Sequence, residues 1–248
     1  MSIPVVLVHG VGLDATMWDG VVAHMREDHA CVAIDMAGHG ASIHPAAETL
    51  SGYVDALEKD ITARADGPVH LVGFSMGAMV AAAYTFCHPG RVSKLVLMNA
   101  VYKRNPVARD AVLGRLRDAE ESGLSVIAEA AIARWFSEKF TTENPDIIQV
   151  VRNCLRSNDL ASYLAAYRVF ATVDKDLAPH LRDIACPLLA MTADGDTNST
   201  PEMSSAIADD VQNGRAVILD GLAHGAPIED PVRVAGALQE FLNEGQAS

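Results

Sequence analysis

The chain has little of what would tie it to a nucleic acid or a membrane. Its 248 residues carry only 19 Lys and Arg against 32 Asp and Glu, a formal net charge of −13, and the basic residues form no runs. Such an acidic chain is poorly suited to bind nucleic acid or an anionic membrane. The N-terminal segment has no positive region and no apolar run long enough for a signal sequence or a membrane span. We therefore expect a cytoplasmic protein without nucleic-acid or membrane partners.

Cysteine is also scarce. The four cysteines (Cys31, Cys87, Cys154 and Cys186) are scattered, and no two have the C-x-x-C spacing of a zinc site. We expect buried free thiols that pack as small hydrophobes, and neither a metal site nor a disulfide framework. Half of the residues are hydrophobic, so a chain of this length can bury a core without such cross-links.

Short apolar runs rich in Val, Ile and Leu recur along the chain without polar alternation. Such runs are typical of strands buried on both faces of a parallel sheet. The expected strands are Pro4–Val8, Cys31–Ile34, His70–Gly73, Lys94–Met98, Pro187–Met191 and Ala216–Leu219. Helical stretches separate most of them: Trp18–Met25, Ser51–Ala65, Met76–Phe86, Met203–Asp209 and Pro231–Asn243. This alternation predicts an α/β fold with a doubly wound, mostly parallel sheet of about six strands.

The alternation stops between the fourth and fifth expected strands, where residues 101–182 read as successive helices interrupted at Pro145 and Pro179. We expect a helical cap over residues 101–182, inserted into a core of residues 1–100 and 183–248. Ligands of open α/β sheets bind at the carboxyl ends of the strands, which such a cap could cover. The cap has 12 Lys and Arg against 11 Asp and Glu, and the core has 7 against 21. Most cap arginines are expected to solvate helix faces, yet the asymmetry is compatible with an anionic substrate.

Ser75 lies in a G-x-S-x-G run, Gly73-Phe74-Ser75-Met76-Gly77. The motif is weak alone, but an expected strand precedes it and a helix-forming segment, Ala78–Ala83, follows it. A serine on such a sharp strand-to-helix turn has a strained backbone and projects its hydroxyl from the sheet edge. A Cβ at Gly73 or Gly77 would clash where the strand and the helix approach each other. The context predicts that Ser75 is the nucleophile of a serine hydrolase.

A serine hydroxyl needs a positioned base to react at neutral pH. The partners should follow in the order serine, acid, histidine, each after a later strand. His224 follows the last expected strand and is the only histidine beyond His180. Asp194 and Asp196 both follow the preceding strand, and we favour Asp196 because it stands next to the turn that leads to Pro201. Its task would be to fix the tautomer of His224 and to stabilise the imidazolium that forms.

The tetrahedral intermediate also needs backbone donors for its oxyanion. His9-Gly10-Val11-Gly12 follows the first expected strand, and its glycines let the chain fold back toward Ser75. The backbone N–H groups of Val11 and Met76 are the expected oxyanion pair. Hydrolases with a G-x-S-x-G turn of this kind draw one donor from the residue after the nucleophile and the other from a loop that follows a neighbouring strand. We expect His9 to brace this loop, since the chain order is wrong for the catalytic base.

As a set, these motifs resemble the α/β-hydrolase superfamily, and the match spans nearly the whole chain. The motifs that carry it are His9–Gly12, Asp35–Ser42, Gly73–Gly77 and His224. The superfamily usually begins with an antiparallel hairpin, whereas this sequence starts directly on the His-Gly strand. We therefore expect the α/β-hydrolase fold with that hairpin missing and an essentially all-parallel sheet.

Within the superfamily, the chain is most similar to the 3-oxoadipate enol-lactonase group. The similarity lies in Ala133–Phe140, in Ser157–Asp159 with Tyr163, and in Asp196 with Thr200–Met203 leading to His224 and Glu229–Pro231. It implies a small, carboxylated ester or enol-lactone beneath the cap and no cofactor. Arg134 and Trp135 become candidate substrate-binding residues, a guanidinium for a carboxylate and an aromatic wall. Arg168, in a segment that departs from the group, is a second candidate anion contact; the alternative is that these side chains pack the cap.

The sequence thus favours a carboxylic ester hydrolase or lactonase that works through an acyl-enzyme. One alternative is a carbon–carbon bond hydrolase or a perhydrolase with the same triad. The run His224-Gly225-Ala226-Pro227-Ile228 counts against the former, because carbon–carbon hydrolases of this fold tend to have a tryptophan shortly after the histidine. Another alternative is a small-ligand receptor with little turnover, which a complete triad disfavours. A homodimer is compatible with the sequence.

Overall fold

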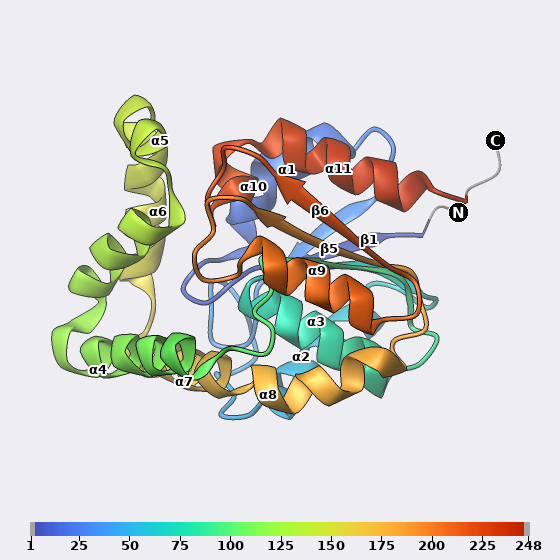
Figure 1. Ribbon diagram of the computed structural model, residues 1–248, viewed down its shortest axis with the longest axis horizontal. Coiled ribbons are helices and arrows are strands. Elements are labelled where there is room, and N and C mark those ends of the chain that lie inside the picture. Colours follow the sequence, from blue (N-terminus) through green and yellow to red (C-terminus); the bar gives the residue numbers. More distant parts are fainter. Residues whose placement is uncertain (1–2, 246–248) are drawn as a thin grey trace.

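The computed structural model describes residues 3–245, which form one six-stranded sheet flanked by helices (Figure 1). The strands are β1 (Val5–Val8), β2 (Cys31–Ile34), β3 (Val69–Phe74), β4 (Val92–Met98), β5 (Leu188–Ala193) and β6 (Gly214–Leu219). Their order is β2-β1-β3-β4-β5-β6, and every neighbouring pair is parallel. The prediction of a mostly parallel sheet of about six strands is confirmed, and the strand pairs within residues 3–245 are all parallel.

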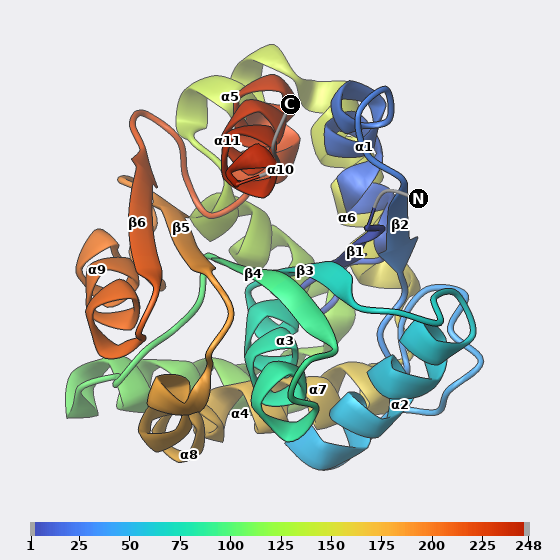
Figure 2. The same ribbon diagram turned by 90° about the vertical axis from the view of Figure 1, so that its right-hand side faces the viewer.

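Helices cover both faces of the sheet. They are the 3₁₀ helix η1 (Ala15–Trp18), α1 (Asp19–Met25), α2 (Leu50–Thr62), α3 (Met76–Cys87), α9 (Pro201–Asp210), α10 (Ala226–Glu229) and α11 (Pro231–Asn243). Figure 2 shows α1 and α11 on one face and α2, α3 and α9 on the other. The fold is therefore doubly wound, as the alternation of strands and helices predicts.

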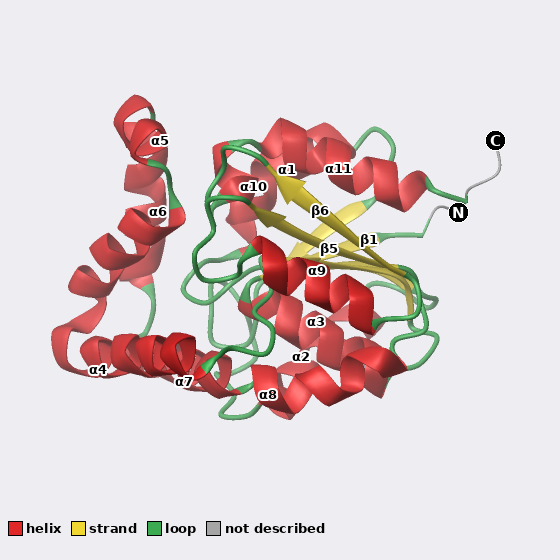
Figure 3. Cartoon of the chain, in the orientation of Figure 1, coloured by secondary structure: helices red, strands yellow, loops and turns green. Residues whose placement is uncertain are grey.

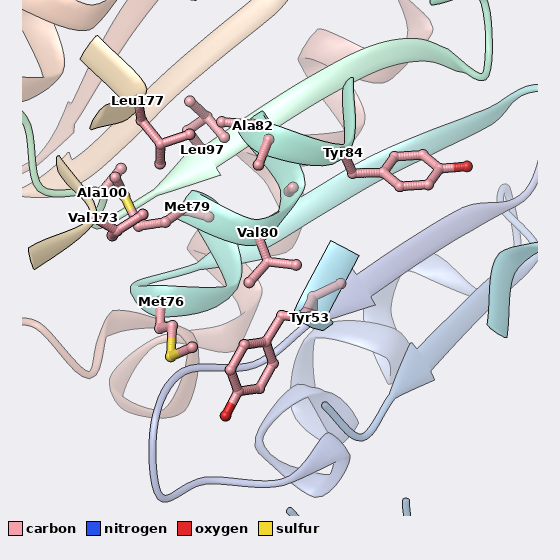
Figure 4. Close-up of a cluster of buried hydrophobic side chains, with 14 of the residues drawn as sticks. Tyr53, Met76, Met79, Val80, Ala82, Tyr84, Leu97, Ala100, Val173 and Leu177 are labelled. Carbon is pink, nitrogen blue, oxygen red and sulfur yellow. The ribbon is translucent and has the colours of Figure 1, made fainter. Parts of the chain in front are cut away.

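Alternate residues of a strand contribute to two separate hydrophobic cores. On β1, Val6 and Val8 belong to the core around α3, whereas Val5 and Leu7 belong to the core beneath α1 and α11. Figure 4 shows part of the α3 core, to which Met79 and Val80 of α3 and Leu97 of β4 all belong. Both faces of the strand are buried, which explains why the strands read as unbroken apolar runs.

The segment between β4 and β5 is helical, as predicted. It comprises α4 (Pro106–Trp135), α5 (Glu138–Glu143), α6 (Pro145–Ser157), α7 (Leu160–Thr172), α8 (Asp174–Leu177) and the 3₁₀ helix η2 (Ala178–Asp183). Helices α4 to α7 stand beside the ends of β5 and β6 (Figure 3), whereas α8 and η2 contact α3. The division into a core and a cap of residues 101–182 stays a prediction about domain organisation.

Polar side chains cap the N-termini of three helices of this segment, α4, α5 and α7. Asn105 Oδ1 accepts the Ala108 N–H at 2.8 Å and starts α4, and Asp159 Oδ1 accepts the Ser162 N–H at 2.8 Å and starts α7. Helix α4 bends at Gly123, where φ is 72°. The long helix therefore has two arms, and residues on one arm are not in helical phase with those on the other.

No helix among the described residues is long and apolar enough to cross a membrane. The four cysteines are free thiols, and three of them are partly buried. Cys87 is exposed, contrary to the expectation that all four are buried, because it ends α3 at the protein surface.

Candidate active site

Ser75 lies at the turn between β3 and α3 with φ 53° and ψ −116°, a backbone conformation that residues other than glycine rarely adopt. Its backbone N–H donates to the Met98 carbonyl at 2.8 Å, which ties the turn to the end of β4. A Cβ on Gly73 would lie 2.3 Å from the Gly77 carbonyl oxygen, and one on Gly77 would lie 2.3 Å from the His9 carbonyl oxygen. Only glycine fits at either position, so the strained turn is built into the packing.

His224 follows β6 and pairs with Asp196, which follows β5. The His224 Nδ1–H donates to Asp196 Oδ2 at 2.6 Å, and both side chains are almost fully buried. A carboxylate can only accept, so this bond places the His224 proton on Nδ1 and leaves Nε2 free to act as a base. The geometry is that of a base oriented by an acid.

Burial opposes the charge of Asp196, but His224 and several hydrogen bonds hold the pKa of its carboxyl below its usual value. Asp196 Oδ1 accepts the backbone N–H groups of Asn198 at 2.9 Å and Ser199 at 3.0 Å. The Asp196 side chain is thus ionised and locked in place, as the partner of an imidazolium must be.

Asp194, the other candidate acid, is exposed and points elsewhere. Its Oδ1 accepts the Gly221 N–H at 2.7 Å, which links the loop after β5 to the loop after β6. The structure therefore brings Asp196 to His224 and leaves Asp194 with a role in loop geometry.

Asn99 is a site residue that the sequence analysis missed. It follows β4 with φ 51°, is fully buried, and its Nδ2 donates to Asp196 Oδ2 at 2.8 Å and to Thr192 Oγ1 at 3.2 Å. The available signal was a polar residue directly after a buried strand, the same signal that pointed to Asp194 and Asp196.

The loop after β1 lies against Ser75. A Cβ on Gly10 would lie 3.1 Å from Ser75 Cβ. His9 Nε2 accepts the Met36 N–H at 2.9 Å, so its Nδ1–H donates to the Gly10 carbonyl at 2.7 Å. Burial, reinforced by His39, lowers the His9 pKa to about 4, which keeps the ring neutral at pH 7. His9 thus braces the loop.

The two predicted oxyanion donors directly follow Gly10 and Ser75, the residues at which the loop after β1 meets the turn after β3. Val11 is in the loop after β1, and Met76 is the first residue of α3. Within residues 3–245, neither backbone N–H donates a hydrogen bond to the protein. The Gly12 carbonyl accepts Asn158 Nδ2 at 2.8 Å, so the end of α6 also holds this loop. The oxyanion role of Val11 and Met76 stays a prediction.

A cavity of about 460 Å³ lies over Ser75 and His224. Its other lining residues come from the end of β3, from the loops after the strands and from α4, α7 and α9: Gly10, Val11, Phe74, Val101, Arg104, Asn105, Ala108, Ala111, Arg115, Arg134, Trp135, Tyr163, Tyr167, Phe170, Thr197, Asn198, Thr200 and Met203. This set has three arginines and no aspartate or glutamate. The charged side chains of the lining are therefore all cationic, in a chain that is acidic as a whole.

Arg134 and Trp135 line this cavity, as the sequence analysis expects. The Trp135 ring lies 5.9 Å from the His224 ring, and the Trp135 carbonyl accepts the Gly225 N–H at 2.6 Å. A Cβ on Gly225 would collide with the Phe136 ring at 2.5 Å. The end of α4 is thus docked directly on the loop that carries His224.

Arg168 requires a correction. It lies on α7 outside the lining of the cavity, its side chain is 55% exposed, and it forms an ion pair with Glu120 at 2.6 Å. Its helical phase turns it to solvent, and we do not retain it as a substrate contact. Arg115 and Arg104 line the cavity instead, although Arg104 is already paired with the buried Asp174 at 2.9 Å.

No group of three or more His, Cys, Asp or Glu side chains in residues 3–245 has the arrangement of a metal site. The candidate reacting groups are Ser75, His224 and Asp196. A serine, a histidine and a carboxylate in this arrangement can perform acyl transfer.

Comparison with known proteins identifies the family of the chain. Residues 5–237 match the model of the alpha/beta hydrolase family. The chain is 33% identical over 244 residues to the (E)-2-((N-methylformamido)methylene)succinate hydrolase of Acinetobacter baylyi, covering 96% of this chain and 90% of that protein. It is 24% identical to 3-oxoadipate enol-lactonase 2 of the same organism, covering 94% of this chain and 86% of that protein.

The fold also matches solved structures. A thermophilic esterase from Thermogutta terrifontis, solved with bound malate, superposes with a TM-score of 0.88 at 27% identity, covering 98% of this chain and 90% of that one. The resemblance to the enol-lactonase group is confirmed by the matches to such enzymes. The chain therefore belongs to the alpha/beta hydrolase family.

Proposed function

We propose that this protein is a serine hydrolase that cleaves a small carboxylic ester or enol-lactone through an acyl-enzyme. The observation that carries the proposal is the joint placement of Ser75, on its strained turn, and His224, bonded to Asp196, in one cavity. The candidate nucleophile, acid and base follow one another along the chain in the order that this fold requires, serine, aspartate and histidine.

In this proposal, His224 Nε2 takes the Ser75 Oγ proton as Oγ attacks the carbonyl carbon. The N–H groups of Val11 and Met76 donate to the oxyanion, and Asp196 stabilises the imidazolium. Collapse breaks the bond to the leaving oxygen, which takes the proton from His224. A water molecule, deprotonated by His224, then attacks the acyl carbon and releases the acid and free Ser75.

The arginines of the cavity support an acidic substrate. The names of two relatives point the same way, because one specifies a substituted succinate and the other 3-oxoadipate, both dicarboxylic acids. We propose that the Arg134 guanidinium binds a substrate carboxylate and that the Trp135 ring forms a wall of the site.

A second candidate is the cleavage of an N-acyl bond in a carboxylated substrate. The relative that shares 33% of its residues favours it, because its name specifies an N-methylformamido group. The same triad serves this reaction, with nitrogen in place of oxygen as the leaving atom.

The test is a panel of carboxylated esters, enol-lactones and N-acyl compounds, assayed for kcat/KM with the wild type and Ser75→Ala. The proposal expects turnover of at least one class by the wild type and a loss of about 10⁴-fold or more in Ser75→Ala. Turnover of carbon–carbon substrates or peracid formation instead would favour those alternatives. Ligand binding without any turnover would favour a receptor.

We also propose a cytoplasmic location. The four free thiols support it, since a reducing compartment keeps cysteines unpaired. Cell fractionation that recovers the protein in the periplasm or the medium would contradict this location.

A further inference from the structure

Two arginines in the cavity have no carboxylate to balance their charge. Arg115 lies in the first arm of α4 and Arg134 in the second, and both line the cavity. Neither forms an ion pair within the described chain, whereas Arg104 is compensated by Asp174 at 2.9 Å. Each arginine is only partly exposed to solvent. A guanidinium that is partly removed from water is normally paired with a carboxylate, because charges are costly to remove from water.

The two guanidinium groups belong to one cluster with two tyrosines. Arg115 Nε donates to the Tyr167 hydroxyl at 3.1 Å, and the Tyr167 ring stacks on Tyr163 at 5.7 Å between centroids. Burial lowers the pKa of Arg134, and the charge of Arg115 lowers it further. Both arginines line the same cavity, so their positive charges repel each other there, and an anion bound in the cavity would relieve the repulsion.

Tyr163 connects this cluster to the reacting centre. Its side chain is only 2% exposed, it lines the cavity, and its hydroxyl makes no hydrogen bond in residues 3–245. A Cβ on Gly12 would lie 2.9 Å from the Tyr163 ring, so the ring packs on the oxyanion loop. An anion bound by the cluster would therefore lie in the same cavity as the carbonyl that Ser75 attacks.

We propose that Arg115 and Arg134 together select a substrate with two free carboxylates, and that Arg115 is the residue that distinguishes it from a monocarboxylate. Two uncompensated guanidinium groups match a net ligand charge of −2, and their planar forks suit carboxylates. The inference rests on the proposed function only as regards the bond that is cleaved. The binding of the two carboxylates does not depend on it.

The test measures binding by calorimetry to Ser75→Ala, so it needs no turnover. Succinate and glutarate are compared with butyrate and valerate, which have the same chain lengths and one carboxylate, and with inorganic phosphate. The proposal expects each dicarboxylate to bind about 10-fold or more tightly than its monocarboxylate counterpart. Equal binding, or tighter binding of phosphate, would overturn it whatever the variants do.

The role of Arg115 is tested in the same background. Arg115→Gln should reduce dicarboxylate affinity about 10-fold and leave monocarboxylate affinity within about 2-fold, because Arg134 still binds one carboxylate. Arg115→Lys, which keeps the charge, should retain more of the preference and serves if the Gln variant fails to fold. Arg168→Gln is the matched control on the cap surface and should change neither affinity. A preference that survives both Arg115 substitutions would overturn the assignment.

These results separate the two proposals. A dicarboxylate preference without hydrolysis of any ester, lactone or N-acyl compound would leave this inference standing and remove the proposed function. Hydrolysis that is indifferent to substrate charge, with equal binding of mono- and dicarboxylates, would do the reverse.

Discussion

Asn99 donates to the same oxygen of Asp196 that accepts the His224 proton. Asn99 Nδ2 lies 2.8 Å from Asp196 Oδ2, and His224 Nδ1 lies 2.6 Å from it. With the two backbone N–H groups on Oδ1, this arrangement satisfies both carboxylate oxygens in a buried place. We therefore regard Asn99 as a positioning residue that holds the acid in register with the base.

Removal of the Asn99 side chain should slow the chemical step. Asn99→Gly suits φ 51° and removes only the amide, so we expect kcat to fall about 10- to 100-fold with KM within about 2-fold, the loss of a hydrogen bond to a charged group. Lys103→Gly, at the other positive-φ residue near the end of β4, should keep wild-type kinetics. Steady-state kinetics on both variants decides, and an unchanged kcat in Asn99→Gly would refute the role.

The choice between the two loop aspartates is directly testable. Asp196→Asn should lower kcat about 10⁴-fold, because the amide no longer fixes the His224 tautomer or stabilises the imidazolium. Asp194→Asn should keep kcat within a few-fold, since the Asp194 side chain is exposed and accepts the Gly221 N–H of the neighbouring loop rather than a proton from His224. The reverse order of the two effects would make Asp194 the acid.

The turn at Ser75 should not tolerate a methyl group on its second glycine. A Cβ at Gly77 would meet the His9 carbonyl at 2.3 Å, so Gly77→Ala should destabilise the fold by about 3 kcal/mol or more in urea unfolding. Gly236→Ala, in α11 with open space around it, is the control and should stabilise by about 0.5 to 1 kcal/mol. Similar effects at the two positions would show that the turn can relax.

Stability should fall as the pH drops from about 6.5 to about 4. Burial lowers the pKa of His9 to about 4, so between these values the unfolded chain binds a proton that the folded protein rejects. The contribution of the neutral, buried His9 to the free energy of unfolding is fully present above pH 6.5. About 2 kcal/mol of this free energy is lost by pH 5. His70, whose pKa burial also lowers to about 4, acts in the same direction.

The His9 contribution can be separated by substitution. His9→Gln should make the free energy of unfolding less dependent on pH between 6.5 and 5, as measured by urea unfolding at several pH values. An identical pH dependence in the variant and the wild type would show that His9 titrates normally in the folded state.

The sequence predicted the fold well because its signals are local. The buried strands have apolar runs, and the G-x-S-x-G turn is specified by glycines whose missing Cβ atoms the structure explains. The positions of Asp196 and His224 follow from the same logic, since the ends of parallel strands meet at one edge. The turn that follows Asp196 favoured it over Asp194, and the structure brings Asp196 to His224.

The cavity wall was harder to predict, because side chains on helices reach it through tertiary packing. The bend at Gly123 breaks the helical phase between Arg115 and Arg134, so no periodicity links the two. Arg168 is also an arginine on a helix between β4 and β5, like Arg115 and Arg134, but its helix turns it toward Glu120 and solvent. Residue type alone cannot distinguish an arginine that binds a ligand from one that solvates a helix.

The most direct measurement is mass spectrometry of the protein during turnover of an activated ester such as p-nitrophenyl acetate. The account predicts that an acyl group accumulates on Ser75 while p-nitrophenol is released in a burst. Ser75→Ala should show no adduct and no turnover. Acylation of another residue, or full activity of Ser75→Ala, would contradict the claim that Ser75 is the nucleophile.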